Sequence, residues 1–189
     1  MGKKLVMDSA SLVSVLMNCF NGEKYLREAI DSIINQTHQN WELVFWDNQS
    51  TDKSKAIFDS YQDERLKYYY APEHTDLGGG RANAFKYLYG DYIAVLDVDD
   101  IWLPTKLKKQ LQLFTDPDVG IVISNTLFFN ETDERILYDG EYPPEGDVFR
   151  ELLTGYFVSL ETLILRKSVV DKLDYGFDAD FSFIADFDL

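Results

Sequence analysis

Apolar runs and amphipathic stretches alternate along the first half of the chain. Residues 12–20 are nearly continuously apolar and rich in Val and Leu, and residues 41–46 and 92–96 repeat this pattern. Such runs are typical of strands that are buried on both faces of a mostly parallel sheet. Between the first two runs, apolar residues recur at three- and four-residue spacing, which predicts a helix with one stripe against the sheet. These residues are Leu26, Ala29, Ile30, Ile33 and Ile34. The pattern therefore predicts an α/β fold.

The remaining elements are predicted from turn and cap signals. We expect a helix capped by Ser50 or Thr51, a strand over 65–70, a loop over 72–80 with three consecutive glycines, and a helix from Arg81 to a C-cap at Gly90. After the third apolar run we expect a helix from Pro104, a strand over 119–124, a hairpin over 126–138, a helix over 147–153 and a strand over 157–165. The hairpin would make the sheet mixed.

The two ends of the chain carry weaker signals. Residues 182–189 indicate the start of a helix that has neither a last turn nor a C-cap. We therefore expect residues 1–189 to form a single domain that is truncated at its C-terminus, with residues 1–10 as a flexible N-terminus.

Composition narrows the possible functions. The chain has 189 residues, 46% of them hydrophobic, which is enough for one domain with a real core. Its net charge of −15 argues against DNA or RNA as a partner, because binding phosphate backbones requires clustered Lys and Arg. The single Cys19 and the absence of an apolar segment of signal-peptide length favour a cytoplasmic protein. Docking on the inner face of the cell membrane is left open.

The third apolar run ends in an acidic cluster. Asp97, Asp99 and Asp100 lie within four residues, at the carboxyl end of the predicted strand over 92–96. Ligands bind at that edge of an open α/β sheet. Neighbouring carboxylates repel one another unless they share a cation, and hard oxygen ligands suit Mg²⁺ or Mn²⁺. The cluster therefore indicates a metal site that holds a phosphorylated ligand. An acidic turn in which Asp100 caps the next helix is the alternative.

Six segments together resemble one family. They are residues 13–21, 25–33, 47–52, 80–83, 90–93 and 96–100. Their order and spacing resemble the family 2 inverting glycosyltransferases, which have the GT-A fold. The resemblance implies a Rossmann-like three-layer α/β/α sandwich with a central, mostly parallel but mixed sheet. It also implies transfer of a sugar, with inversion, from a nucleotide-diphosphate donor, expected to be UDP-linked, to a saccharide or lipid-linked acceptor. The expected process is the synthesis of cell-surface polysaccharide or lipopolysaccharide.

The resemblance assigns roles to individual residues. It implies that Asp47 accepts a hydrogen bond from the imide N–H of a uracil-type base, although a turn-forming or capping role is the alternative. Arg81 is expected near the base or phosphates, and Asp97 toward the ribose. Asp99 is expected on the Mn²⁺ or Mg²⁺ ion that bridges the two phosphates. The same resemblance adds four residues to the donor site: Asn18, Asn21, Asn83 and Val98.

The expected catalytic residue lies at the end of the chain. Asp186 resembles the acid at a helix start where this family keeps its catalytic base. The alternative is that the acid only favours a helix N-terminus through the helix dipole. The sequence departs from the family pattern at two positions. Asn48 and Gln49 stand where a second acid and a small residue are more common in the family. His38 and His74 are isolated, and we assign neither to the metal.

Two rival functions stay open. A metal-dependent nucleotidyltransferase would also combine an α/β sheet with carboxylates, but it would normally have a basic, glycine-rich loop after the first strand, which residues 18–22 lack. A non-catalytic module that binds sugar nucleotides is the other possibility. Such a module would tolerate the loss of Asp97, Asp99 and Asp186.

Overall fold

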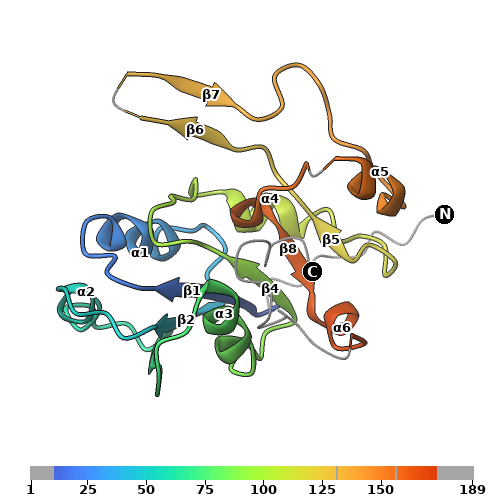
Figure 1. Cartoon of the computed structure of the whole chain (residues 1–189). Coiled ribbons are helices and arrows are strands. Elements are labelled where there is room, and N and C mark those ends of the chain that lie inside the picture. Colours follow the sequence, from blue (N-terminus) through green and yellow to red (C-terminus); the bar gives the residue numbers. More distant parts are fainter. Residues whose placement is uncertain (1–10, 131, 156, 174–189) are drawn as a thin grey trace.

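A six-stranded mixed sheet organises the fold. The computed structural model describes residues 11–130, 132–155 and 157–173 (Figure 1). The strand order is β3-β2-β1-β4-β8-β5. These strands are β1 (Val13–Cys19), β2 (Trp41–Asp47), β3 (Leu66–Tyr70), β4 (Tyr92–Val95), β5 (Ile121–Val122) and β8 (Ile164–Arg166). Strands β1 to β4 pair in parallel, whereas β8 is antiparallel to both β4 and β5. The predicted mostly parallel, mixed sheet is confirmed.

Helices cover both faces of this sheet. One face carries α1 (Leu26–Ile34), α2 (Ser54–Phe58) and α4 (Lys106–Leu111), and the other carries α3 (Leu77–Phe85) and α6 (Lys167–Val170) (Figure 1). Alternate residues of β1 serve the two cores, because successive side chains of a strand point to opposite faces. Met17 packs into the core beneath α1, and Leu16 packs into the core beneath α3. The three-layer prediction is therefore confirmed.

The three consecutive glycines lie in a helix, so the prediction of a loop over 72–80 was wrong for them. All three are buried in α3, which begins after Asp76. The Asp76 side chain accepts a hydrogen bond from the Gly79 N–H at 2.8 Å and so caps the helix. A Cβ on Gly80 would lie 2.8 Å from Asn18 Nδ2. The close approach of α3 to β1 therefore accounts for Gly80.

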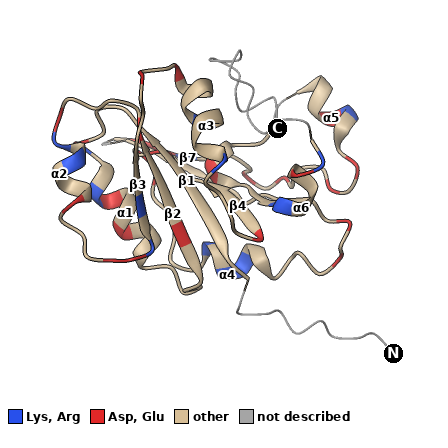
Figure 2. Ribbon diagram, turned by 90° about the horizontal axis from the view of Figure 1, so that it is seen from below, with Lys and Arg blue, Asp and Glu red and all other residues tan. Residues whose placement is uncertain are grey.

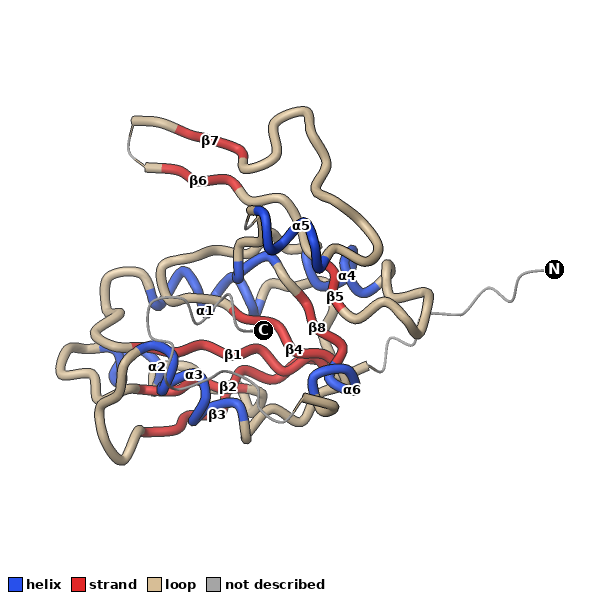
Figure 3. Tube along the Cα trace, turned by 45° about the vertical axis from the view of Figure 1, so that its right-hand side comes forward, coloured by secondary structure: helices blue, strands red, loops and turns tan. Residues whose placement is uncertain are grey.

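The predicted hairpin forms, but it stands apart from the central sheet. Strands β6 (Leu127–Phe129) and β7 (Glu134–Ile136) make a separate two-stranded sheet, and all their residues are exposed (Figure 3). The central sheet is mixed because of β8, which was not the reason predicted. After the hairpin come α5 (Phe149–Thr154) and a 3₁₀ turn over Leu160–Thr162, which replaces the first part of the strand expected over 157–165.

Two predicted caps were also wrong. Helix α2 begins at Ser54, and Ser50 and Thr51 instead contact the loop that follows β1. Helix α3 ends at Phe85, so Gly90 is not its C-cap. The structural predictions for residues 1–10 and 182–189 lie outside the described residues. Within the described ranges, no helix has the length and apolar character needed to cross a membrane.

Charged side chains are spread over many elements. Figure 2 shows Lys and Arg on α2, α4 and α6 among more numerous Asp and Glu residues. The expectation that the chain binds no nucleic acid stays a prediction.

Gly90 is required where the chain enters β4. A Cβ on Gly90 would lie 2.6 Å from the Ser14 backbone nitrogen and 2.7 Å from the Leu12 carbonyl oxygen. We expect Gly90→Ala to lower the free energy of unfolding by about 1–3 kcal/mol, because backbone atoms cannot easily move aside. Urea unfolding would measure this loss. Gly155→Ala is the matched control, because nothing lies within 4 Å of its added Cβ. Equal stabilities of the two variants would contradict the packing argument.

Candidate functional site

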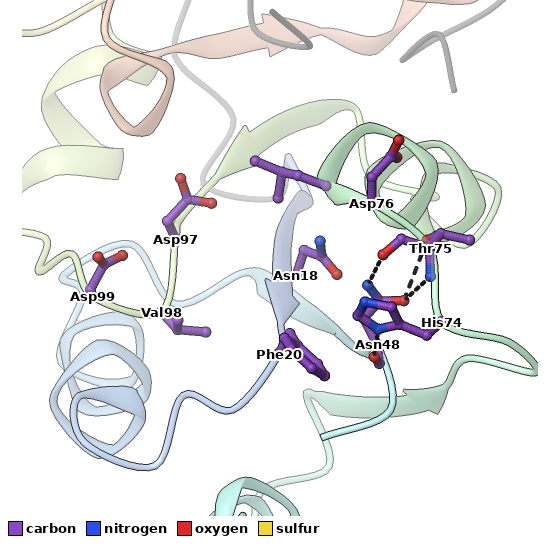
Figure 4. A pocket seen from close by; sticks show the side chains of 10 residues that line it. Asn18, Phe20, Asn48, His74, Thr75, Asp76, Asp97, Val98 and Asp99 are labelled. Atoms are coloured by element: carbon purple, nitrogen blue, oxygen red, sulfur yellow. Dashed lines mark hydrogen bonds between the residues drawn. The ribbon is translucent and has the colours of Figure 1, made fainter. Parts of the chain in front are cut away.

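A pocket of about 400 Å³ opens at the carboxyl ends of β1, β2 and β4 (Figure 4). Cavities of this size hold small ligands. The lining residues are Asn18, Phe20, Asn48, His74, Thr75, Asp76, Leu77, Asp97, Val98 and Asp99. The pocket therefore brings together four residues of the predicted site, namely Asn18, Asp97, Val98 and Asp99. Figure 4 shows Asp97 and Asp99 at one end and His74 and Asn48 at the other.

An ion pair fixes the first acid of the cluster. Arg81 Nη2 donates to both carboxylate oxygens of Asp97, at 2.9 and 3.0 Å. The Arg81 side chain is only 1% exposed, whereas that of Asp97 is 35% exposed. Asp97 is thus held from behind and still faces the pocket. Asp99 is exposed and lines the same end of the pocket.

Asn18 offers an acceptor at the middle of the pocket. Its Oδ1 atom is buried and has no hydrogen-bond partner within the described part of the chain. Leaving a buried acceptor unsatisfied costs about 1–3 kcal/mol. A ligand with an N–H or O–H group would therefore be favoured at this position.

Four predicted donor-site residues do not line the pocket. Asp47 is fully buried, and its oxygens accept hydrogen bonds from the Ser50 N–H at 2.7 Å and the Tyr68 hydroxyl at 2.5 Å. Asn21 Oδ1 accepts from the Thr51 N–H at 2.8 Å, so it joins the loops after β1 and β2. The remaining two lie on α3, where Arg81 is buried and Asn83 is half-buried. The predicted catalytic residue, Asp186, lies outside the described residues.

Asn48 has a role that the sequence did not indicate. Its Nδ2 donates to the Thr75 carbonyl at 2.7 Å, and its Oδ1 accepts from the Thr75 N–H at 3.1 Å. An amide side chain has both a donor and an acceptor, so it can pair with the N–H and the carbonyl oxygen of one residue. Asn48 therefore holds the segment that leads into α3. The substitution of an amide for the family's usual acid was the available signal.

Interlocking hydrogen bonds hold the loops after β1 and β2 together. The Glu23 N–H donates to Asp52 Oδ2 at 2.8 Å, and the Lys53 N–H donates to Glu23 Oε2 at 2.9 Å. The Gly22 N–H donates to Ser54 Oγ at 2.9 Å. These bonds join the loop after β1, which follows the pocket residue Phe20, to the loop after β2.

Comparison with known proteins identifies the family. Residues 14–173 match the sequence profile described as "Glycosyl transferase family 2", which covers most of the chain. The chain belongs to glycosyl transferase family 2. The family predicted from the sequence is therefore confirmed. An Escherichia coli member described as "UDP-Glc:alpha-D-GlcNAc-diphosphoundecaprenol beta-1,3-glucosyltransferase WfgD" is 27% identical over 88% of this chain. The chain spans 64% of that relative's length.

Solved structures share the GT-A fold. The crystal structure of S. aureus TarS 1-349 superposes with a TM-score of 0.78 at 22% identity, covering 93% of this chain and 52% of TarS 1-349. The mannosyltransferase PcManGT from Pyrobaculum calidifontis, in complex with GDP-Man and Mn²⁺, has a TM-score of 0.68 at 18% identity, covering 93% of this chain and 50% of that protein. At these identities the likeness shows the fold alone.

The acids of this family 2 chain suit a metal that arrives with phosphates. The described residues contain no group of three His, Cys, Asp or Glu side chains that could hold a metal. Mg²⁺ is usually held by one or two carboxylates together with substrate phosphates. Asp99 matches that kind of site, since it lines the pocket and offers hard oxygen atoms, whereas both oxygens of the neighbouring Asp97 accept from Arg81. The site therefore fits an Mg²⁺ or Mn²⁺ ion that is coordinated by both the protein and the substrate phosphates.

A second charged cluster lies behind the acidic loop. Burial raises the pKa of Asp100 to about 7, and the nearby charges of Glu161, Asp97 and Asp99 add to this effect. Burial lowers the pKa of Lys106 to about 7, and the Glu161 carboxylate opposes this shift. Lys106 Nζ lies 4.3 Å from the centroid of the Trp102 ring. In the described part of the chain, this buried ammonium group has no hydrogen-bond partner.

The two shifted groups make opposite contributions to stability. Asp100 binds its proton more tightly in the folded state, so its contribution to stability falls as pH rises from about 4 to about 7. Lys106 binds its proton less tightly in the folded state, so its contribution rises with pH between about 7 and about 10.

We expect Lys106→Met to raise the free energy of unfolding at pH 7 by about 1–4 kcal/mol, because an apolar side chain replaces a buried, unpaired charge. The gain should shrink toward pH 10, where the lysine is neutral. Urea unfolding from pH 5 to 10 with chelator present would measure both effects. Asp100→Asn should instead remove the dependence below pH 7. A gain for Lys106→Met that does not change with pH would contradict the charge argument.

Proposed function

We propose that the chain binds a nucleotide-diphosphate sugar, UDP-linked, together with Mn²⁺ or Mg²⁺. The sugar is transferred with inversion to a saccharide or lipid-linked acceptor in cell-surface polysaccharide or lipopolysaccharide synthesis. The observation that carries this proposal is the pocket that combines Asp97 and Asp99 at one end with Asn18 and Asn48 farther along. The family membership supports sugar transfer, and WfgD is named for a UDP-linked donor and a diphosphoundecaprenol-linked acceptor. A lipid-linked acceptor agrees with a cytoplasmic protein that docks at the inner face of the membrane.

The predicted site residues have distinct tasks in this proposal. Asp99 would hold the Mn²⁺ or Mg²⁺ ion, which would supply positive charge to the leaving diphosphate. Asp97 faces the ribose, and Arg81 orients it through the ion pair described above. Asn18 and Val98 contact the donor along the middle of the pocket.

Asp47 reads the base in this proposal. An ionised carboxylate has about four lone-pair positions, so its bonds to Ser50 and Tyr68 leave acceptor capacity for an imide N–H. Asn21 and Asn83 stay predicted donor-site residues that support the surrounding loops and helix. The base itself is open to test, because TarS has been crystallised with UDP-GlcNAc and PcManGT with GDP-Man.

We expect UDP to bind only when Mn²⁺ or Mg²⁺ is present, because the diphosphate would otherwise meet two carboxylates. Asp99→Asn should remove this metal dependence and weaken binding. Isothermal titration calorimetry with and without chelator would measure both. Asp118→Asn is the matched control, since this exposed acid lies on a turn and does not line the pocket. UDP affinity that chelator leaves unchanged would contradict the metal assignment, and binding of GDP alone would contradict the choice of base.

Asp47→Ala should weaken UDP binding by about ten- to a hundredfold, because it removes a charge-assisted hydrogen bond to the base. Tyr68→Phe is its matched control. That variant loses the same hydroxyl contact to Asp47 but keeps the carboxylate. If both variants lose thermal stability equally and keep their UDP affinity, Asp47 has only a turn-forming role.

Asp186→Asn should leave donor affinity unchanged and lower turnover by about 10²–10⁴, because an inverting transfer needs a carboxylate to take the acceptor's proton. Asp188→Asn is the control, since residues two apart on a helix do not share a face. Turnover with a radiolabelled donor and the anomeric configuration of the product would be measured. Near-normal turnover of Asp186→Asn, or a product that retains the donor's configuration, would disprove the assignment.

A further inference from the structure

His74 is a pocket residue, and its fold-imposed contacts determine which ring nitrogen donates a hydrogen bond and which accepts one. Its Nδ1 atom lies 2.8 Å from the carbonyl oxygen of Asn48. A carbonyl oxygen can only accept a hydrogen bond, so Nδ1 must carry the proton. In the neutral imidazole the other nitrogen, Nε2, is then an acceptor. Within the described part of the chain, Nε2 has no hydrogen-bond partner, and the exposed ring lines the pocket.

The position of this ring is held from two sides. The His74 ring packs against Phe20 with a centroid distance of 4.4 Å and an interplanar angle of 50°. Asn48, which supplies the carbonyl, is only 3% exposed and is tied to Thr75 by the pair of backbone contacts described above. The carbonyl that selects the tautomer is therefore anchored itself.

The location in the pocket indicates which part of a ligand meets His74. Asp99 lies at the opposite end (Figure 4), where the metal and diphosphate are proposed to bind, and Asp97 beside it is proposed to face the ribose from that side. At the other end the Phe20 ring packs against His74, and Asn48, Thr75 and Asp76 also line the pocket there (Figure 4). Aromatic rings beside polar groups suit a flat nucleoside, and the Asp76 carboxylate disfavours phosphates at this end.

We propose that His74 is a specificity-determining residue, whose Nε2 accepts a hydrogen bond from an N–H or O–H group of the nucleoside. The inference rests on the proposed binding of a nucleotide sugar. The donor group is the 2′-hydroxyl of the ribose, or the imide N–H of the base in the case where Asp47 has only a turn-forming role. Nε2 selects for a hydrogen-bond donor at this place and against a ligand that presents only an acceptor.

The tautomer can be observed directly. Long-range ¹H–¹⁵N spectra of the labelled chain should show His74 protonated at Nδ1 and unprotonated at Nε2 at pH 8. A ring protonated at Nε2 would overturn the proposal.

Calorimetry with nucleotide analogues tests the ligand contact. His74→Phe keeps an aromatic ring beside Phe20 but removes the acceptor, so UDP affinity should fall about three- to tenfold. One of two analogues, 3-methyl-UDP or 2′-deoxy-UDP, should bind wild type and His74→Phe with equal affinity, because it lacks the donated hydrogen. Equal affinities of the two proteins for 3-methyl-UDP identify the imide N–H of the base as the donor group. Equal affinities for 2′-deoxy-UDP identify the 2′-hydroxyl of the ribose. His38→Phe is the matched control, since that ring contacts only the backbone oxygens of Ser11 and Asn40 among its described contacts.

The outcomes separate the two proposals. If the wild-type chain binds no nucleotide with either metal, the proposed function fails and this inference fails with it. If the wild type binds UDP but His74→Phe binds it equally well, only the inference is overturned. A loss in His74→Phe that is the same for UDP and both analogues would also overturn it, because such a loss reflects a distorted loop.

Discussion

The buried guanidinium of Arg81 constrains the pocket side of this protein. A charge taken out of water is tolerated only when a partner compensates it, and here the partner is the Asp97 carboxylate at the end of β4. Helix α3 must therefore lie close enough to the sheet for the two groups to meet. Gly80 allows that approach, since any side chain at this position would strike Asn18. One electrostatic pair thus positions both a helix and the first acid of the pocket.

The pocket is assembled from segments that are distant in the sequence. Parallel strands end at the same edge of the sheet, so the residues after β1, β2 and β4 meet there. Hydrogen bonds between Glu23 and the loop at Asp52, and between Asn48 and Thr75, then join the loops to one another. The scaffold supplies the edge, and these side-chain contacts give the edge its shape.

The sequence predicted those parts of the fold in which a pattern repeats. The buried strands and the apolar stripe of α1 were predicted correctly, because continuous apolar runs and a three- to four-residue apolar spacing are each typical of one kind of element. The glycines were misread because the same composition suits a loop and a tightly packed helix. Asp99, Val98 and Asn18 line the pocket, since they lie at or just beyond the ends of strands. Contacts such as those of His74 and Asn48 depend on loops whose paths no local pattern specifies.

The position of β8 has a consequence for the order of assembly. Strand β5 precedes β8 in the chain, but its partner in the sheet is β8, which lies between it and β4. During synthesis, the growing chain can complete the four parallel strands while the edge of β4 is still open. Closure waits until residue 166 has left the ribosome, since only then can β8 insert and bring β5 with it. Until that moment β4 is an additional edge strand, and open strand edges can pair with neighbouring chains.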